Sequence, residues 1–192
     1  MQSQSGKSLV ELLVGVAVAA MFITISTSAI EATNQGVQLA TSVSELRSVF
    51  QQVRALALAR DRYVAIRFRP EGSHWSWTIY EDGDGDGVRN DDIARGTDRR
   101  IDGPRRFQFA SAAIAIPEGN VPDPTAPGQY LANRLPVRFG TSMLCSFSPS
   151  GEASNGSIVL AKGKQVIVIR VQAQSARINV LRWDGRRWTT GT

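Results

Sequence analysis

The sequence predicts an α+β fold in which one long N-terminal helix packs on antiparallel β-sheets. Three observations predict it: residues 12–30 carry no charged side chain, residues 39–57 place apolar side chains at helical spacing, and the chain beyond Tyr63 reads as short β-type runs. The length of 192 residues suits one globular domain with an appendage, and the formal net charge is +5.

The first predicted element is the apolar run LLVGVAVAAMFITISTSAI at residues 12–30. A helix over this run is about 28 Å long, close to the roughly 30 Å hydrocarbon thickness of a bilayer. We therefore expect a transmembrane helix over residues 7–30. The alternative is a cleaved secretory signal, but its apolar core typically has about 7 to 15 residues and follows a basic stretch, which is missing here.

The second element continues the same helix as an amphipathic segment to about residue 60. Its apolar side chains recur at steps of four and three residues, and polar residues separate them. The stripe consists of Leu39, Val43, Leu46, Phe50, Val53 and Ala57. We expect this stripe to cover one face of a β-sheet.

The remaining chain is rich in Val, Ile, Phe and Trp in short runs bounded by turn residues. The predicted strand runs are residues 63–70, 74–82, 106–116, 135–140, 143–149, 157–162, 165–173 and 176–183. Alternation within them is imperfect, which we attribute to a sheet covered on one side. Residues 117–130, with several prolines, predict an exposed irregular loop, and the basic segment 95–106 predicts a solvated loop.

Glu11 stands at the start of the apolar run, where an ionised carboxylate in hydrocarbon costs roughly 2.5 to 3.5 kcal/mol. The surrounding residues 6–17, GKSLVELLVGVA, resemble the class III leader of type IV pilins and pseudopilins. The resemblance implies cleavage after Gly6, methylation of the new terminus at Lys7, and a role for Glu11 in assembly. In physical terms, an amine of a neighbouring chain can stabilise a buried carboxylate in a filament.

Two features depart from that family pattern. The first mature residue is usually phenylalanine or methionine, whereas Lys7 places a cation one helical turn before Glu11 and can pair with it inside one chain. The leader MQSQSG also lacks a basic residue, so Lys7 alone supplies the positive-inside signal. A further alternative places Glu11 in the headgroup region, where its cost is small.

The resemblance extends over most of the chain. WTIYEDGDGDGVRNDD followed by RRI, and CSFSPSGEASNGSIVL with VIVIRVQAQSARINV, are similar to strand segments of GspH/FimT minor pseudopilins. The resemblance implies a pilin-like fold with a leader at residues 1–6, a transmembrane and assembly helix at 7–30, and a periplasmic globular domain at 31–192. It implies a non-enzymatic subunit of a type II secretion pseudopilus or type IV pilus. The implied partners are other pseudopilins or pilins, the prepilin peptidase and the bacterial inner membrane.

The stretch DGDGDGVRNDD is similar to a calcium-binding EF-hand loop. Its candidate ligands for a structural calcium ion are Asp82, Asp84, Asp86 and Asn90. The twelfth position is Ile93 and not glutamate, so a bidentate ligand requires Asp91 or Asp92. The alternative interpretation is a solvated hairpin turn without metal.

The C-terminal segment combines arginines with tryptophans. Arginines neutralise phosphates and indoles stack on bases, so a DNA-binding receptor is the alternative function. The candidate DNA-binding residues are Arg182, Arg186, Arg187 and Trp188. The competing interpretation is a strand edge whose tryptophans pack on the domain.

Catalysis finds no support in the sequence. One cysteine, Cys145, and one histidine, His74, give neither an internal disulfide nor a zinc-ligand spacing. We interpret Cys145 as a small buried residue and predict that the protein is not an enzyme.

Overall fold

The computed structural model describes residues 9–72, 74–106 and 114–191, and the side chains of residues 10 and 21–34 lie outside the description. Its first element is a single helix, α1 (Leu9–Arg60), which agrees with the predicted helix to residue 60. The chain divides into two compact units, Met1–Val37 and Gln38–Thr192. Among residues with described side chains, no helix has a segment of the length and apolarity that a membrane span needs.

The predicted apolar stripe of α1 is confirmed within the second unit. Leu39, Leu46, Phe50, Val53 and Ala57 are almost fully buried, and Val43 is 9 % exposed. An ion pair connects the C-terminal end of α1 to the rest of the unit, because the guanidinium of Arg60 pairs with the carboxylate of Glu81.

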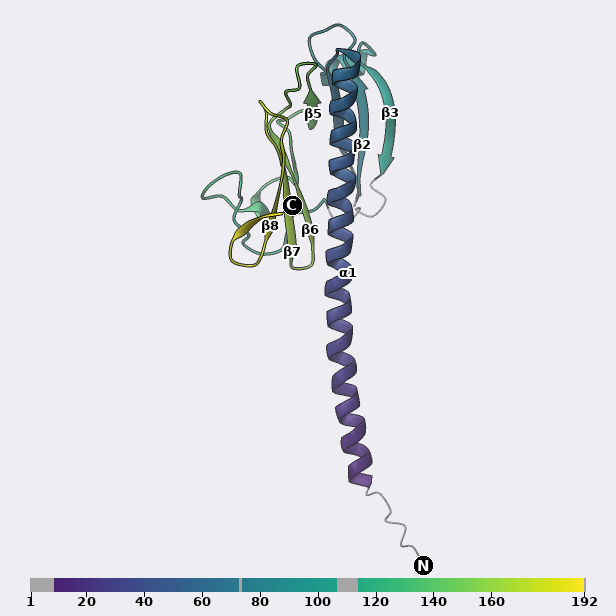
Figure 1. The fold of residues 1–192 in the computed structure, drawn as a ribbon, viewed down its shortest axis with the longest axis vertical. Coiled ribbons are helices and arrows are strands. Elements are labelled where there is room, and N and C mark those ends of the chain that lie inside the picture. The colour runs from purple at the N-terminus through teal and green to yellow at the C-terminus, as the bar shows by residue number, and fades with distance from the viewer. Residues whose placement is uncertain (1–8, 73, 107–113, 192) are drawn as a thin grey trace, which may run out of the picture. The chain divides into compact units, whose positions relative to one another are not determined.

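The first sheet has four antiparallel strands in the order β3-β2-β1-β5 (Figure 1). Its strands are β1 (Val64–Glu71), β2 (His74–Glu81), β3 (Arg99–Arg106) and β5 (Leu144–Phe147). A short helix, α2 (Asn90–Arg95), lies between β2 and β3 in the sequence. Cys145 of β5 is fully buried, as expected from the sequence.

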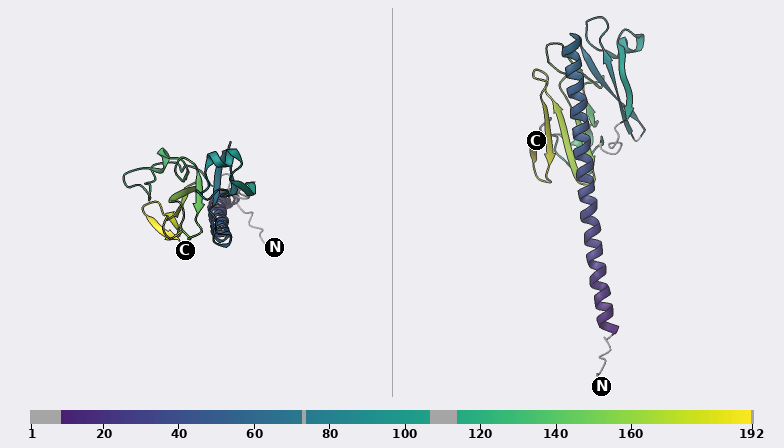
Figure 2. Two further views of the ribbon diagram at one scale, coloured as in Figure 1. Left: turned by 90° about the horizontal axis from the view of Figure 1, so that it is seen from above. Right: turned by 45° about the vertical axis from the view of Figure 1, so that its right-hand side comes forward.

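The second sheet has five antiparallel strands in the order β4-β6-β7-β8-β9. Its strands are β4 (Val137–Arg138), β6 (Gly156–Lys162), β7 (Gln165–Val171), β8 (Ile178–Trp183) and β9 (Trp188–Gly191). A short 3₁₀ helix, η1 (Leu131–Asn133), precedes β4. The two sheets lie on different sides of the part of α1 that belongs to this unit (Figure 2).

One apolar core joins the helix to both sheets. Phe50 of α1 lies among rings of β1, of β5 and of the residue after β4, with centroid distances of 6.3 Å to Phe68, 6.3 Å to Phe147 and 6.4 Å to Phe139. These separations are within the range of favourable aromatic pairs. The helix stripe therefore packs against both sheets rather than one.

Both sheets are also covered on the face away from this core, which corrects the prediction of one-sided cover. On the first sheet, Ala65 and Leu144 pack with Val88 and the partly buried Ile93. On the second sheet, a further cluster contains Val121, Leu131, Val159, Val166 and Val168. Strands buried on two faces carry apolar residues at consecutive positions, which explains the imperfect alternation.

Three further predictions need correction. Residues 95–106 are not a solvated loop throughout, because β3 occupies residues 99–106 and gains the ladder hydrogen bonds of β2. Of the strand predicted at 106–116, Arg106 ends β3 and Ile114 forms an isolated bridge with Leu160, while residues 107–113 lie outside the described residues.

The loop at residues 117–130 is irregular as predicted, but it is not exposed throughout. Val121 and Asp123 are buried within it. The chain folds back on itself here, since the Asp123 amide donates to the Gln129 carbonyl at 2.8 Å and the Leu131 amide donates to Val121 at 2.9 Å. This fold-back covers the second sheet.

Candidate functional site

The predicted processing and assembly residues fall at the start of the chain. Gly6 and Lys7 lie outside the described residues. Glu11 is in the first turn of α1, and its side chain is exposed, as are those of residues 12–20. A carboxylate in the first helical turn is favoured by the positive end of the helix dipole.

Asp82 organises the acidic loop that follows β2. Its buried carboxylate accepts hydrogen bonds from the amides of Asp84 at 3.1 Å, Gly85 at 2.8 Å and Gly87 at 3.0 Å. A carboxylate that receives several backbone N–H groups remains satisfied without a metal ion. Asp82 is thus a structural residue of this loop.

A second carboxylate, Asp98, closes the loop from its far end. It accepts hydrogen bonds from the amides of Gly83 at 3.2 Å and Arg89 at 2.8 Å. Gly83 is required by close approach, because a Cβ atom there would lie 2.0 Å from the Thr97 carbonyl oxygen. The hydrogen bonds to Asp82 and Asp98 therefore define the conformation of the loop.

Three of the four predicted calcium ligands come together. Carboxylate oxygens of Asp82, Asp84 and Asp86 lie within 4.8 Å of one another. The pKa of Asp86 is raised, because desolvation is the largest influence and the Asp84 and Asp92 carboxylates add to it, against the opposing effect of Arg89. Such a cluster favours a nearby positive charge, and the guanidinium of Arg89 pairs with Asp86.

Asn90, the fourth predicted ligand, has a buried Oδ1 atom with no hydrogen-bond partner among the described residues. Asn90 begins α2, and its side-chain nitrogen Nδ2 donates to the backbone carbonyl of Ser142 at 3.2 Å. Ile93, which occupies the twelfth position of the motif, packs on the apolar cluster of the first sheet. The loop thus continues as a short helix held by apolar contacts.

The predicted DNA-binding residues surround the turn between β8 and β9. Trp183 and Trp188 pair across these strands with ring centroids 5.4 Å apart, and the Trp188 indole donates to the Pro122 carbonyl at 2.9 Å. Both rings pack on the outer cluster of the second sheet. The prediction of a strand edge with packed tryptophans is therefore confirmed.

The arginines of this edge are exposed. Arg182 precedes Trp183 in β8 and so points to the opposite face of the sheet. The amides of Arg186 and Arg187 donate to Asp184 at 2.8 Å, and these two hydrogen bonds are the largest influences that lower the pKa of Asp184. The turn is thus held by its own carboxylate, which also lies 3.6 Å from Nε of the exposed Arg187.

Asp123 is a buried charged group that sequence reasoning missed, as it missed Asp98. The side chain of Asp123 has no exposed surface and faces two arginines, Arg134 and Arg138. The available signal was the tripeptide Asp-Pro-Thr, since an aspartate two residues before a threonine commonly forms a turn through its own side chain.

Comparison with protein families places this architecture among known proteins. Residues 42–182 match the family model described as Type II transport protein GspH. No match was found to a curated protein or to a solved structure. The matched range begins in the buried stripe of α1 and ends in β8, so it contains nearly all of the helix–sheet core described above. The chain therefore belongs to the GspH family of type II transport proteins.

Proposed function

We propose that this protein is a minor pseudopilin or minor pilin, a non-enzymatic structural subunit of a type II secretion pseudopilus or a type IV pilus. The observation that carries the proposal is the family match over residues 42–182, preceded in the chain by a helix that starts at Leu9. The family assignment supports a structural role in a transport machine.

In this proposal the prepilin peptidase cuts after Gly6 and methylates Lys7, and residues 7–30 anchor the chain in the inner membrane with residues 31–192 in the periplasm. The uncharged run at 12–30 supports the anchor, because its length matches the hydrocarbon layer. Mass spectrometry of the chain from cells is the test of processing. We expect a polypeptide that begins with methylated Lys7, and a chain that retains Met1 contradicts the proposal.

Glu11 then sets the register between neighbouring subunits through the amino terminus of another chain. Replacement by Glu11→Ala or Glu11→Gln is expected to preserve membrane insertion and to abolish incorporation into sheared filaments. Glu31→Ala, a glutamate change farther along the same helix, is the matched control and is expected to incorporate normally. Normal incorporation of both Glu11 variants rules out this role.

DNA reception on a pilus is the second candidate function. The exposed arginines at the β8–β9 turn, beside Trp188, favour it. A fluorescence titration with duplex DNA at several salt concentrations tests it, because phosphate contacts make affinity fall steeply with salt. We expect Arg186→Gln with Arg187→Gln to weaken binding, and Arg100→Gln with Lys164→Gln, an equal change of charge elsewhere, to leave it unchanged. Absence of salt-sensitive binding eliminates this function.

Calcium is proposed as a structural ligand of the acidic loop. The proximity of the Asp82, Asp84 and Asp86 carboxylates supports it. Calcium is expected to raise the thermal unfolding midpoint of the wild-type chain, since a ligand of the folded state stabilises it. The variant Asp84→Asn with Asp86→Asn keeps the hydrogen-bonded Asp82 and is expected to lose the response. An equal response in wild type and variant contradicts the site.

A further inference from the structure

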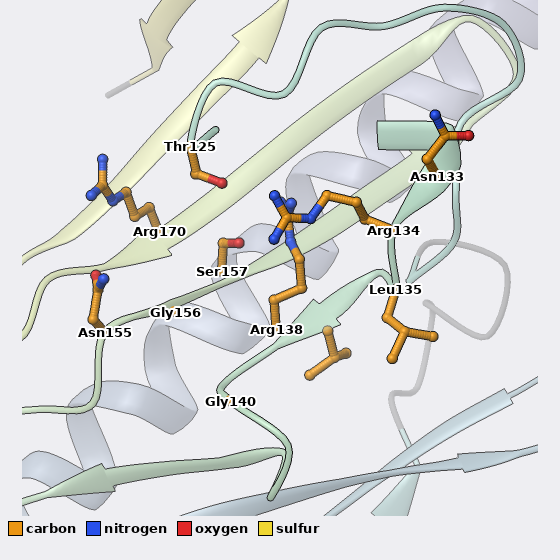
Figure 3. A pocket seen from close by; sticks show the side chains of 11 residues that line it. Thr125, Asn133, Arg134, Leu135, Arg138, Gly140, Asn155, Gly156, Ser157 and Arg170 are labelled. Carbon is orange, nitrogen blue, oxygen red and sulfur yellow. The ribbon is translucent and has the colours of Figure 1, made fainter. Parts of the chain in front are cut away.

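A recess of about 440 Å³ lies on the second sheet, next to the loop that carries Asp123. Figure 3 shows Arg134 and Arg138 together in it, with Arg170 to one side. Polar side chains of Thr125, Asn155 and Ser157 complete the same lining. The residues that line this recess do not include those of the acidic loop or of the β8–β9 turn.

Strand register fixes the arginines on one face of the sheet. Arg138 of β4 lies opposite Ser157 of β6, and Ser157 lies opposite Arg170 of β7. Directly paired residues on neighbouring strands share a face. The Cα atoms of Arg138 and Arg170 are therefore about 10 Å apart, two strand spacings, with Ser157 between them. The backbone thus holds two cations on either side of a hydroxyl group.

Gly156 makes this arrangement possible. A Cβ atom at that position would lie 2.2 Å from the Phe139 ring and 2.5 Å from the Arg138 carbonyl oxygen. Glycine therefore permits β4 to approach β6 closely enough to place Arg138 at the base of the recess.

Arg138 presents an unused pair of donors. Its Nη1 atom bonds Asp123, and its side chain is 12 % exposed. Its Nε and Nη2 atoms are buried and have no hydrogen-bond partner among the described residues. These two atoms form the edge of a guanidinium that binds both oxygens of a carboxylate or phosphate at once.

The carboxylate of Asp123, beside the recess, is already engaged. Asp123 accepts hydrogen bonds from the Thr125 amide at 2.8 Å and hydroxyl at 2.7 Å, and its other oxygen faces Arg138 and, at 3.6 Å, Arg134. Burial by itself would raise the pKa of Asp123, but the hydrogen bonds from Thr125 and Arg138 outweigh it and lower the pKa. Asp123 is thus ionised, and both of its oxygens already have partners. The three arginines of the recess carry more positive charge than this one carboxylate neutralises.

We propose that this recess is a binding site for a carboxylate on an acidic polypeptide segment, which the Nε–Nη2 edge of Arg138 receives with Arg170 and Arg134 beside it. The chemistry of the donors is shared by carboxylates and phosphates. A polypeptide carboxylate fits better because the Nε and Nη2 atoms of Arg138 are buried and because the exposed Leu135 adds apolar surface to the lining. The inference rests on this recess and is independent of the proposed assembly role.

Binding of a fluorescein-labelled, end-blocked hexaglutamate peptide to the full chain in a non-ionic detergent tests the proposal. Fluorescence anisotropy gives the affinity, and the corresponding hexaglutamine peptide is expected not to bind. Arg138→Lys retains a positive charge for Asp123 but lacks the two-donor edge, so we expect affinity to fall about tenfold or more. Arg170→Gln, which spares Asp123, is expected to weaken binding about threefold or more.

The matched control is Arg100→Gln, an exposed arginine of β3 in the other sheet, which is expected to bind like wild type. Circular dichroism and the unfolding midpoint confirm that each variant is folded. Equal affinity for wild type, Arg138→Lys and Arg170→Gln overturns the site. Binding of inorganic phosphate or of single-stranded DNA that depends on Arg138, without peptide binding, overturns the assignment to a polypeptide.

Discussion

Asp123 shows how one side chain determines the conformation of an irregular segment. It is the buried acceptor for Thr125 in its own loop and for Arg138 in β4, so it ties the loop to the sheet. Removing one partner of such a buried pair leaves the other charge unpaired, which is costly.

Acid is therefore expected to weaken the fold through Asp123. Its pKa in the folded protein lies below the usual 3.8, so its stabilising contribution is complete above that value and is lost as pH falls through the lowered pKa. Thermal unfolding between pH 7 and pH 2.5 measures this, and we expect Asp123→Asn to be less stable by about 3 kcal/mol at pH 7. Below about pH 4 the difference should shrink, and a constant difference contradicts the argument.

Phe50 is the residue at which the helix and the two sheets meet. We expect Phe50→Ala to reduce the free energy of unfolding by about 3–5 kcal/mol, because the ring is fully buried among three others. Urea denaturation gives the value. Leu58→Ala on the same helix is the control, since Leu58 is 50 % exposed and should change stability by less than about 1 kcal/mol.

Among the elements, α1 is the best predicted from sequence. Its stripe follows from helical spacing alone, since each apolar residue recurs after one turn. In contrast, β3 was missed because half of its residues are arginines at a sheet edge, where exposure removes the apolar alternation that identifies a strand.

The candidate sites also differ in whether the sequence could predict them. The Asp82 cluster could be predicted because its ligands are close in sequence and separated by glycines. The recess at Arg138 could not, because its residues come from a loop and strands distant in sequence, and only strand register brings them together. Helix α2 was missed since it is short and depends on the apolar contact of Ile93.

The terminal strand β9 depends on its first residue. We expect Trp188→Ala to reduce the free energy of unfolding by about 1–2 kcal/mol, because it removes the ring contact with Trp183 and the hydrogen bond to Pro122. Thr190→Ala, an exposed change in the same strand, is the control for guanidinium denaturation. A Trp188→Ala chain as stable as this control would show that the tryptophan pair does not hold the edge.

At the scale of the whole molecule, Leu39, one residue into the second compact unit, is the first buried core residue among the side chains that the structure describes. A chain of residues 38–192 is therefore expected to fold by itself with a cooperative thermal transition in circular dichroism. A chain of residues 44–192 lacks buried Leu39 and Val43 and should lose about 2–5 kcal/mol of stability. Equal midpoints for the two chains contradict this boundary of the core.

The same core encloses the sulfur of Cys145. Burial raises the pKa of this thiol well above its ordinary value, so the reactive thiolate is scarce as well as shielded. A folded chain can consequently pass through an oxidising environment without cross-linking to a second copy. A thiol reagent reaches that sulfur only when β5 separates from its neighbours. The rate of alkylation therefore measures how often this part of the core opens.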